Sequence, residues 1–399
     1  MLKGLMKSRK NGLILMALLL AVVPLYAQTI SGIQTDGSRQ NNIVTAVPFL
    51  SIVPQARAGA MGNAGVAVDA DANASAMNVS ALAFLPVGSS GASVSYSPWL
   101  KSLVPDMSLA YLSGYLRLDD RNTIAASFRY FSLGAVQFTD NYFQNLGTYN
   151  PNELAFDVSY TRSFGPDFAM GSTLRFIYSN LYSGQFATGS QIQAGKAIAA
   201  DVSGLYKKET ILFGQSAIWS AGINLSNIGT KVSYNTGGAA YFLPANFKLG
   251  TAATLLPDND NRFVIAIDLN KLMAPTQPVY DGNGKISKGV DPNRSVPAGI
   301  FGSFADAPGG IGEEFKEVGV STGIEYSYQE KFALRAGYNY QNPNKGNSRY
   351  LTLGAGFKYH VFKIDFAYLL GSTQKSPMAN TLRFSLQASF GAEDKMKKN

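Results

Sequence analysis

Few residues of this 399-residue chain could support catalysis. It has no cysteine and a single histidine, His360. Thiol catalysis, disulfides and cysteine-bound metals are therefore excluded, and a zinc site with two histidines cannot form. His360 lies in a short turn between two long alternating segments, which is a poor place for the base of a hydrolase, because that base needs a nucleophile and an orienting group beside it. We expect no catalytic residue, no metal site and no cofactor.

Two short motifs resemble binding loops but lack their essential positions. Residues 69–73 begin like a calcium loop, yet its sixth position is Ala74 instead of glycine and its twelfth is Ser80 instead of glutamate. We interpret its carboxylates as turn caps. The second motif matches neither a dinucleotide fingerprint nor a phosphate-binding loop. It places a glycine at every third position, where we expect close packing: Gly59, Gly62 and Gly65.

The N-terminus predicts export. Four of the first ten residues are basic, residues 12–23 are apolar, and the run Leu25-Tyr26-Ala27 offers a cleavage site before Gln28. This is typical of a cleaved secretory signal peptide over residues 1–27. An uncleaved anchor is the alternative, but the apolar run is shorter than the ~20 residues that span a bilayer. Because so much of the formal charge of +8 lies in this segment, it does not indicate a nucleic-acid-binding protein.

Alternation of apolar and polar residues dominates the rest of the chain. In one segment Leu351, Leu353 and Phe357 share a face, and Thr352 and Gly354 share the other. Segments of about 10 residues or more are longer than the ~5–6 residues of soluble strands and match the ~9–11 residues of a tilted membrane strand. Fourteen strands are predicted, near 88–97, 108–117, 121–134, 153–163, 167–179, 196–207, 216–228, 244–256, 261–273, 312–328, 331–341, 348–359, 361–370 and 380–390.

The connections between these strands alternate between short and long. Tight polar turns are expected at 118–122, 165–167, 207–210, 257–261, 329–330 and 360, and longer segments lie between them. This alternation is typical of outer-membrane barrels, which have short periplasmic turns and long extracellular loops. We predict an all-β fold, a transmembrane antiparallel barrel over residues 88–390, followed by a polar periplasmic tail at 391–399. A secreted β-sandwich adhesin is the alternative, and both strand length and loop asymmetry argue against it.

Residues 28–87 do not alternate in this way. They are rich in alanine and glycine, with a short helix expected near 72–84. A fourteen-stranded barrel is wider than its own side chains can fill, since ~8 strands already reach that limit. We therefore predict that this segment plugs the lumen, with these plug-to-barrel contacts: Arg57, Gly59, Gly62, Gly65, Asp71 and Asn78. Arg57 is expected either to remain solvated or to pair with a lumen carboxylate such as Asp157, Asp201, Asp268 or Asp365.

The plug segment also carries a resemblance. Residues 56–67 (ARAGAMGNAGVA), followed by 71–74, Asn78 and 81–83, resemble the PorV/PorQ family of FadL-like barrels, and the resemblance extends from the signal peptide to Phe390. Family members commonly have Asn-Pro-Ala where this chain has Asn-Val-Ser at 78–80, which leaves the start of the helix open.

The resemblance implies a multi-pass outer-membrane component of the type IX secretion system of Bacteroidetes, without enzymatic activity. Such a protein would bind exported cargo through its C-terminal signal domain and shuttle it to the cell surface. The implied partners are the cargo proteins, a large translocon barrel of the SprA/Sov type, a surface attachment complex with a PorU-type signal peptidase, and outer-membrane lipid, but no nucleic acid. The alternative is a FadL-like channel for hydrophobic small molecules.

The long loops hold the candidate contact residues for cargo. Residues 274–311 contain five prolines, and a loop of this length is rarely without a role. Aromatic side chains in loops suit protein recognition, although they equally suit an aromatic girdle or a lid. The candidates are Tyr142, Phe143, Tyr149, Tyr241, Phe242, Tyr280, Phe301 and Phe304.

Overall fold

The computed structural model describes residues 41–100, 104, 106–139, 144–181, 193–235, 237–371 and 381–391. Within these residues no helix has the length and apolar character needed to cross a bilayer. Two of the predicted loop residues, Tyr142 and Phe143, lie outside the described residues.

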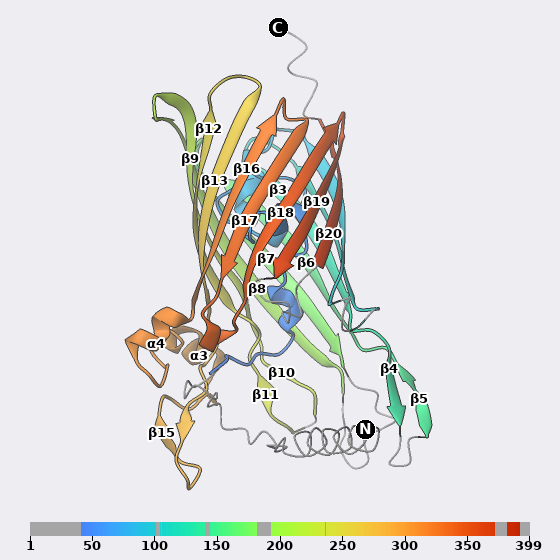
Figure 1. The fold of residues 1–399 in the computed structure, drawn as a ribbon, viewed down its shortest axis with the longest axis vertical. Helices are drawn as coiled ribbons and strands as arrows, with labels where there is room; N and C mark the ends of the chain where they lie inside the picture. The colour runs from blue at the N-terminus through green and yellow to red at the C-terminus, as the bar shows by residue number, and fades with distance from the viewer. Residues whose placement is uncertain are drawn as a thin grey trace, which may run out of the picture. The chain divides into compact units, whose positions relative to one another are not determined.

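Fourteen antiparallel strands form one closed barrel, which confirms the predicted fold class (Figure 1). The first strand pairs with the last from Ser90 opposite Phe390 to Tyr96 opposite Phe384, so the sheet has no free edge there. The barrel strands are β1 (Ser90–Pro98), β2 (Ser108–Arg117), β3 (Asn122–Ser132), β6 (Asn152–Ser163), β7 (Phe168–Asn180), β8 (Gly195–Leu212), β9 (Gln215–Gly229), β12 (Asn246–Leu256), β13 (Asn261–Leu272), β16 (Val318–Tyr328), β17 (Phe332–Tyr340), β18 (Arg349–Tyr359), β19 (Phe362–Gly371) and β20 (Thr381–Phe390).

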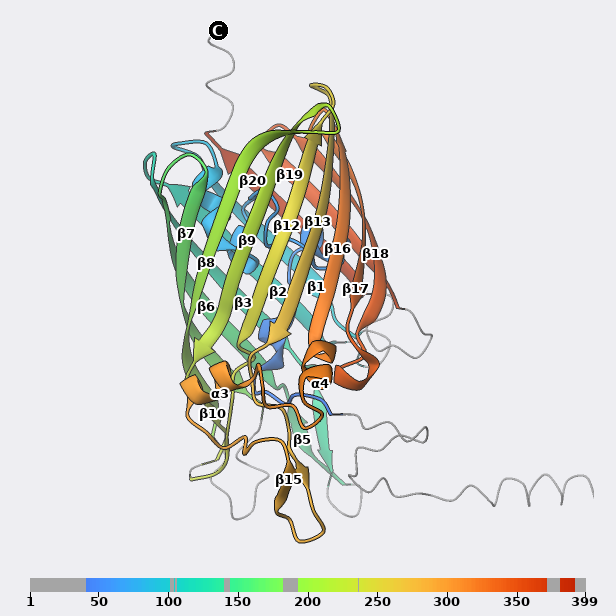
Figure 2. The same cartoon turned by 90° about the vertical axis from the view of Figure 1, so that its left-hand side faces the viewer.

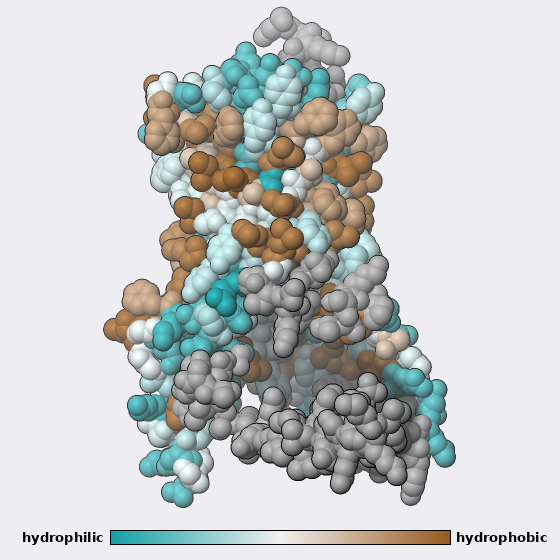
Figure 3. Space-filling view, in the orientation of Figure 1, coloured by the Kyte–Doolittle hydropathy of each residue, from teal (hydrophilic) through white to brown (hydrophobic). Residues whose placement is uncertain are grey.

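The alternating sequence explains which side chains face lipid. On β6, Phe156, Val158 and Tyr160 are exposed, whereas Asp157 and Ser159 between them are buried. Successive side chains of a strand point to opposite faces, so the apolar row faces outward and the polar row faces the lumen. Figure 3 shows the resulting belt of brown side chains across the face of the barrel in view. Closure pairs the backbone groups along the strands, which the hydrocarbon layer requires.

Short turns gather at one end of the barrel, at the top of Figure 1. Two of them share an Asp-x-x-Asn pattern, in which Asp119 or Asp258 accepts hydrogen bonds from the side chain and the backbone N–H of the asparagine three residues later. In the first turn the side chain of Asn122, together with backbone N–H groups, lowers the pKa of Asp119. His360 lies in a third turn, with a left-handed φ of 51°. By the general pattern of outer-membrane barrels, this end faces the periplasm.

The opposite end carries the long connections (Figure 2). Three of them contain small hairpins: β4 (Val136–Thr139) with β5 (Asn145–Tyr149), β10 (Val232–Ser233) with β11 (Ala240–Tyr241), and β14 (Val279–Tyr280) with β15 (Ile286–Lys288). The same end holds the helices α3 (Val296–Gly302) and α4 (Ile311–Lys316) and the 3₁₀ helix η4 (Pro343–Lys345). We call it the long-loop end.

Two predicted boundaries are wrong, and one predicted helix differs in type. Residues 312–317 belong mostly to helix α4, so β16 begins only at Val318. The turn expected at 207–210 is absent, because β8 continues to Leu212 and pairs with β9 up to a turn at 213–214. The expected helix near 72–84 is instead two 3₁₀ helices, η2 (Ala74–Ala76) and η3 (Val79–Phe84).

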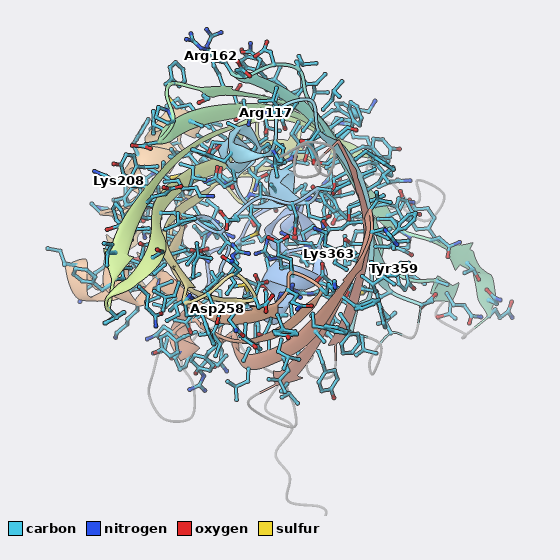
Figure 4. All side chains as sticks on the ribbon, turned by 90° about the horizontal axis from the view of Figure 1, so that it is seen from above. Arg117, Arg162, Lys208, Asp258, Tyr359 and Lys363 are labelled. Atoms are coloured by element: carbon cyan, nitrogen blue, oxygen red, sulfur yellow. The ribbon has the colours of Figure 1, made fainter. Side chains whose placement is uncertain are left out.

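Residues 46–85, which precede β1, lie inside the barrel. They consist of η1 (Pro48–Ser51), α2 (Ala56–Ala60), η2 and η3, joined by irregular turns and shown in blue in Figure 1. Figure 4 looks in from the short-turn end and shows Arg117 and Lys363 within the ring of strands, with Arg162 and Tyr359 outside it. We call residues 46–85 the plug.

Candidate functional site

The plug passes through the lumen from one end of the barrel to the other. At the long-loop end, the backbone N–H of Ala46 donates to the carbonyl of Phe242 over 2.8 Å. At the short-turn end, the Arg117 guanidinium donates to the carbonyls of Ala83 and Leu85. Between these points Phe49 stacks on the inward-facing ring of Phe131, with centroids 6.0 Å apart. The plug is thus fixed to the wall near both of its ends.

A row of alternating charges joins the middle of the plug to the wall. Arg57 donates from Nε and Nη2 to the two oxygens of Glu325 over 2.9 and 2.8 Å. Glu325 also accepts from Arg335 over 2.5 Å, and Arg335 reaches Asp365 over 2.8 Å. These side chains are nearly inaccessible to solvent, so each charge is compensated by its neighbours in the row instead of by water. We call Arg57, Glu325, Arg335 and Asp365 the charge row.

The partner of Arg57 differs from the expectation. None of the four lumen aspartates considered for this role accepts a hydrogen bond from Arg57, which bonds to Glu325 and also to the carbonyl of Asp69. Asp157 and Asp201 bind Arg175 instead, over 2.6 and 2.9 Å. That second cluster braces β6, β7 and β8 against each other, away from Arg57.

A third set of ion pairs, centred on Asp69 and Asp71, holds the loop between α2 and η2. Asp69 binds Lys207 over 2.6 Å and also binds Arg262, so it bridges two strands of the wall. Asp71 lies 3.6 Å from Arg57 and 3.7 Å from Lys363. Its other oxygen accepts the backbone N–H of residue 73 over 2.9 Å, which closes an Asx turn. The acidic run therefore both shapes its own turn and neutralises cations of the wall.

Asn78 connects three parts of the structure. Its side-chain oxygen accepts the backbone N–H of Ser80 over 3.1 Å and so caps η3. Its side-chain nitrogen donates to the carbonyls of Val66 and Gly204 over 2.7 and 3.1 Å. The Asn-Val-Ser departure thus retains the cap, which requires only the asparagine.

The three plug glycines lie where chain segments approach closely. A Cβ on Gly59 would meet the Arg383 side chain, and one on Gly65 would lie 3.1 Å from the Met77 side chain. Gly62 has φ +65° and lies against the backbone of Tyr338. Two wall glycines that the sequence pattern did not single out, Gly323 and Gly337, oppose each other on β16 and β17 and lie against Met61 and, for Gly337, Gly62. Both glycines fall on the lumen-facing row of their strands, where the missing side chain leaves room for the plug backbone, and that was the available signal.

Asp268 is a further anchor of the plug. From the sequence it was expected only as a possible partner of Arg57. Its Oδ2 accepts the backbone N–H groups of Gly65 and Val66 over 2.7 and 3.0 Å. Both donors lie inside the barrel, where water is scarce. One carboxylate therefore satisfies two backbone groups that the plug's own irregular fold leaves without a partner.

Replacing Asp268 by alanine should lower the free energy of unfolding by about 2–4 kcal/mol, since two buried donors would each lose a partner at roughly 1–3 kcal/mol, partly relieved by water. Urea titration of the barrel in lipid vesicles, followed by the gel shift between folded and unfolded forms, measures this change. Asp268→Asn keeps an acceptor oxygen and should lose clearly less. Equal stability of the alanine variant and the parent would contradict the anchoring role.

At the short-turn end, a cavity of about 730 Å³ lies between plug residues 83–85 and the turns that follow Arg117 and Arg162. Two small cavities lie deeper in the lumen, beside the plug. One has a volume of about 30 Å³ and is lined by plug residues that include Arg57 and Asp71. The other, about 40 Å³, lies among Arg129, Arg175 and Lys248. Volumes of this size hold one or a few water molecules. Among the described residues, no group of three Asp, Glu or His side chains is placed to hold a metal ion.

The aromatic residues of the long loops do not form a single surface. Tyr241 and Tyr280 are about half exposed, at 47% and 51%, and lie on separate hairpins. Phe242 is only 8% exposed, because its ring lies against Gly299 of α3, with the Lys231 ammonium 4.4 Å from the ring centroid, so it does not offer a contact surface. Tyr149 donates from its hydroxyl to the carbonyl of Asn180 over 3.3 Å. Phe301 and Phe304 belong to a different surface, outside the barrel wall.

Comparisons with known proteins give a family match and structural similarities. A search of curated proteins found no match. Among solved structures, the chain is similar to the Pseudomonas putida toluene transporter TodX, with 15% identity, a TM-score of 0.49, and coverage of 84% of this chain and 96% of that one. It is also similar to a Pseudomonas aeruginosa FadL homologue, with 10% identity, a TM-score of 0.42, and coverage of 88% and 99%.

The family model described as type IX secretion system protein PorV matches residues 35–279, more than half of the chain. The matched region contains the whole plug and the barrel strands from β1 to β13. The chain belongs to the PorV family of type IX secretion system proteins.

Proposed function

We propose that this outer-membrane barrel binds exported cargo proteins at the type IX translocon and carries them to the surface attachment complex. The observation that supports this proposal is the contrast between the two parts of the site. The lumen is filled by a plug that charged and hydrogen-bonded side chains fix to the wall, whereas the long-loop end carries three hairpins, two of which present an exposed tyrosine. Such an end offers a rigid rim for contacts with a folded domain.

The cargo domain in this proposal is the C-terminal signal domain of the secreted proteins. A large translocon barrel of the SprA/Sov type would deliver it, and a PorU-type signal peptidase in the attachment complex would receive it. No catalysis is assigned to this chain, because removal of the signal would belong to that partner. Tyr241 and Tyr280 are the anchors we assign to cargo, since both are exposed on separate hairpins of the same end.

The alternative is a channel for hydrophobic small molecules. Such a channel needs a path for an apolar solute past the plug. The larger cavity lies at the short-turn end, whereas the two cavities deeper in the lumen measure about 30 and 40 Å³ and are lined partly by charged groups. Uptake would therefore require the plug to release its ion pairs with the wall, which favours the binding protein over the channel.

Exchange of both Tyr241 and Tyr280 for alanine should reduce cargo recovery at least about tenfold, because aromatic anchors at interfaces often contribute about 2 kcal/mol or more. The measurement is a pull-down of the tagged protein from detergent-solubilised outer membranes, with the bound proteins identified by mass spectrometry. The control is Phe213→Ala at the short-turn end, where the ring is 91% exposed and should not contact cargo. Unchanged recovery with the double variant, or a barrel isolated with an apolar ligand and no cargo, would contradict the proposal.

A further inference from the structure

The segment that contains α3 and α4, residues 296–317, lies against the outside of the barrel wall and not over its mouth. Ile300 packs with Met273, and the Phe304 ring meets the Phe247 ring edge to face at 6.3 Å. Figures 1 and 2 agree that both helices project outward from the wall at the long-loop end. We call this segment the flap.

The strand register shows which face of the wall the flap covers. Leu249 of β12 and Leu269 of β13 oppose each other, and both are exposed on the lipid-facing side. Phe247 and Lys271 oppose each other on the same two strands, each two positions closer to the long-loop end than its leucine. Because every second residue of a strand shares a face, Phe247 and Lys271 continue the lipid-facing rows under the flap.

A cluster of ion pairs fixes the flap at this position. Lys271 donates to Glu314 and Glu317 over 2.8 and 2.5 Å. Lys345, from the neighbouring loop, lies 2.8 Å from Glu317 and 2.5 Å from Glu313. A lysine on the outward row would otherwise face lipid headgroups or hydrocarbon unpaired, and the glutamates of α4 neutralise it. The flap is therefore held by its charged inner face.

The outer face of the flap is apolar, and no described residue covers it. Phe301, Ile311 and Phe315 are 77%, 76% and 74% exposed. Ile311 and Phe315 are four residues apart and so share one side of α4, while Glu314 and Glu317 point to the wall. Figure 3 shows this brown patch at the position of α4, beside the border of the brown belt of the barrel.

We propose that the flap is an interfacial lipid anchor, whose Phe301, Ile311 and Phe315 side chains enter the outer leaflet beside β12 and β13. The continuity of the patch with the lipid-facing rows of these strands identifies lipid as the occupant. Amphipathic helices with bulky apolar residues on one face bind membranes in this way, at the level of the headgroups. The anchor orients the long-loop end relative to the membrane surface, a role separate from cargo binding.

The natural absence of cysteine makes this inference directly testable, since a single introduced cysteine carries the only thiol. Ile311→Cys and Phe315→Cys are labelled with a nitroxide and reconstituted in vesicles of phosphatidylcholine and phosphatidylglycerol. Spin-label collision rates with oxygen, which partitions into lipid, and with a water-soluble nickel chelate then report the surroundings. Leu269→Cys on the wall is the lipid control, and Tyr280→Cys on the β14–β15 hairpin is the water control.

We expect oxygen collisions to exceed nickel collisions at both flap positions, as at Leu269→Cys. A nickel rate as high as at Tyr280→Cys would place the flap in water and overturn the proposal. Low collision rates with both reagents would show that protein covers the patch, either a second copy or a partner, and would overturn it equally. Loss of the lipid signature in a variant that also carries Glu314→Gln and Glu317→Gln would support the role of the ion pairs in holding the flap.

Discussion

Replacement of Glu325 by alanine is expected to lower the free energy of unfolding by about 3–5 kcal/mol, the usual loss when one member of a buried ion pair is removed. Glu325 accepts from the guanidinium groups of Arg57 and Arg335, and its carboxylate is 2% exposed. Without it, two buried cations face each other, with Asp69 and Asp71 near Arg57 and Asp365 beside Arg335 as the remaining carboxylates of this cluster. Urea titration in lipid vesicles, followed by the gel shift of the folded barrel, measures the change.

The control for this prediction is an ion pair at the surface. Lys358 and Glu330 lie 3.5 Å apart with side chains 44% and 75% exposed, so Lys358→Ala should alter stability by no more than about 0.5 kcal/mol. If Glu325→Ala and Lys358→Ala unfolded at the same urea concentration, the charge row would not hold the plug. If Glu325→Ala lost stability while the plug stayed protected from added protease, the charge row would stabilise the barrel wall without holding the plug.

The fold was predictable because every lipid-facing strand repeats the same physical constraint. Outward residues must be apolar, inward residues need not be, and the resulting period of two is visible in segments such as 351–357. The boundary of β16 was not predictable in the same way. Residues 312–317 continue a mixed pattern, and only the distant Lys271 and Lys345 explain why Glu314 and Glu317 belong to a helix outside the wall.

The site was predictable in kind but not in its pairings. Arginine and aspartate in a lumen-facing segment indicate buried ion pairs, because an unpaired charge there is costly. Which carboxylate lies beside Arg57 depends on how far α2 enters the barrel, and no local pattern encodes that depth. Likewise, Phe242, Phe301 and Phe304 resemble one another in sequence, yet Phe242 is buried with its ring against Gly299 of the flap, whereas the other two belong to the flap itself.

Because the plug fits tightly against the wall, the second large loss of stability is expected for a substitution at Gly337. Its added Cβ would lie 2.7 Å from the Cα of Met61 and closer still to the backbone nitrogen of Gly62. Backbone atoms on both sides cannot move aside as a flexible side chain would, so Gly337→Ala must displace the turn after α2 from the wall. We expect a loss of stability at or above the upper end of the roughly 1–3 kcal/mol typical of overpacking. We also expect cells that carry the variant to admit vancomycin, which an intact outer membrane excludes.

Gly204 provides the matched control for this change. It also lies on a barrel strand, but its Cβ would be 3.4 Å from the nearest side-chain atom, which is ordinary contact, so Gly204→Ala should fold and exclude vancomycin as the parent does. The Gly62 N–H, which donates to the Thr352 hydroxyl over 2.9 Å, lies directly at the clash. Thr352→Val removes that acceptor without adding bulk, and should weaken the plug by only about 1 kcal/mol. A Gly337→Ala barrel as stable and as impermeable as these two variants would mean that the plug turn can shift without cost, and that close packing at Gly323 and Gly337 does not position it.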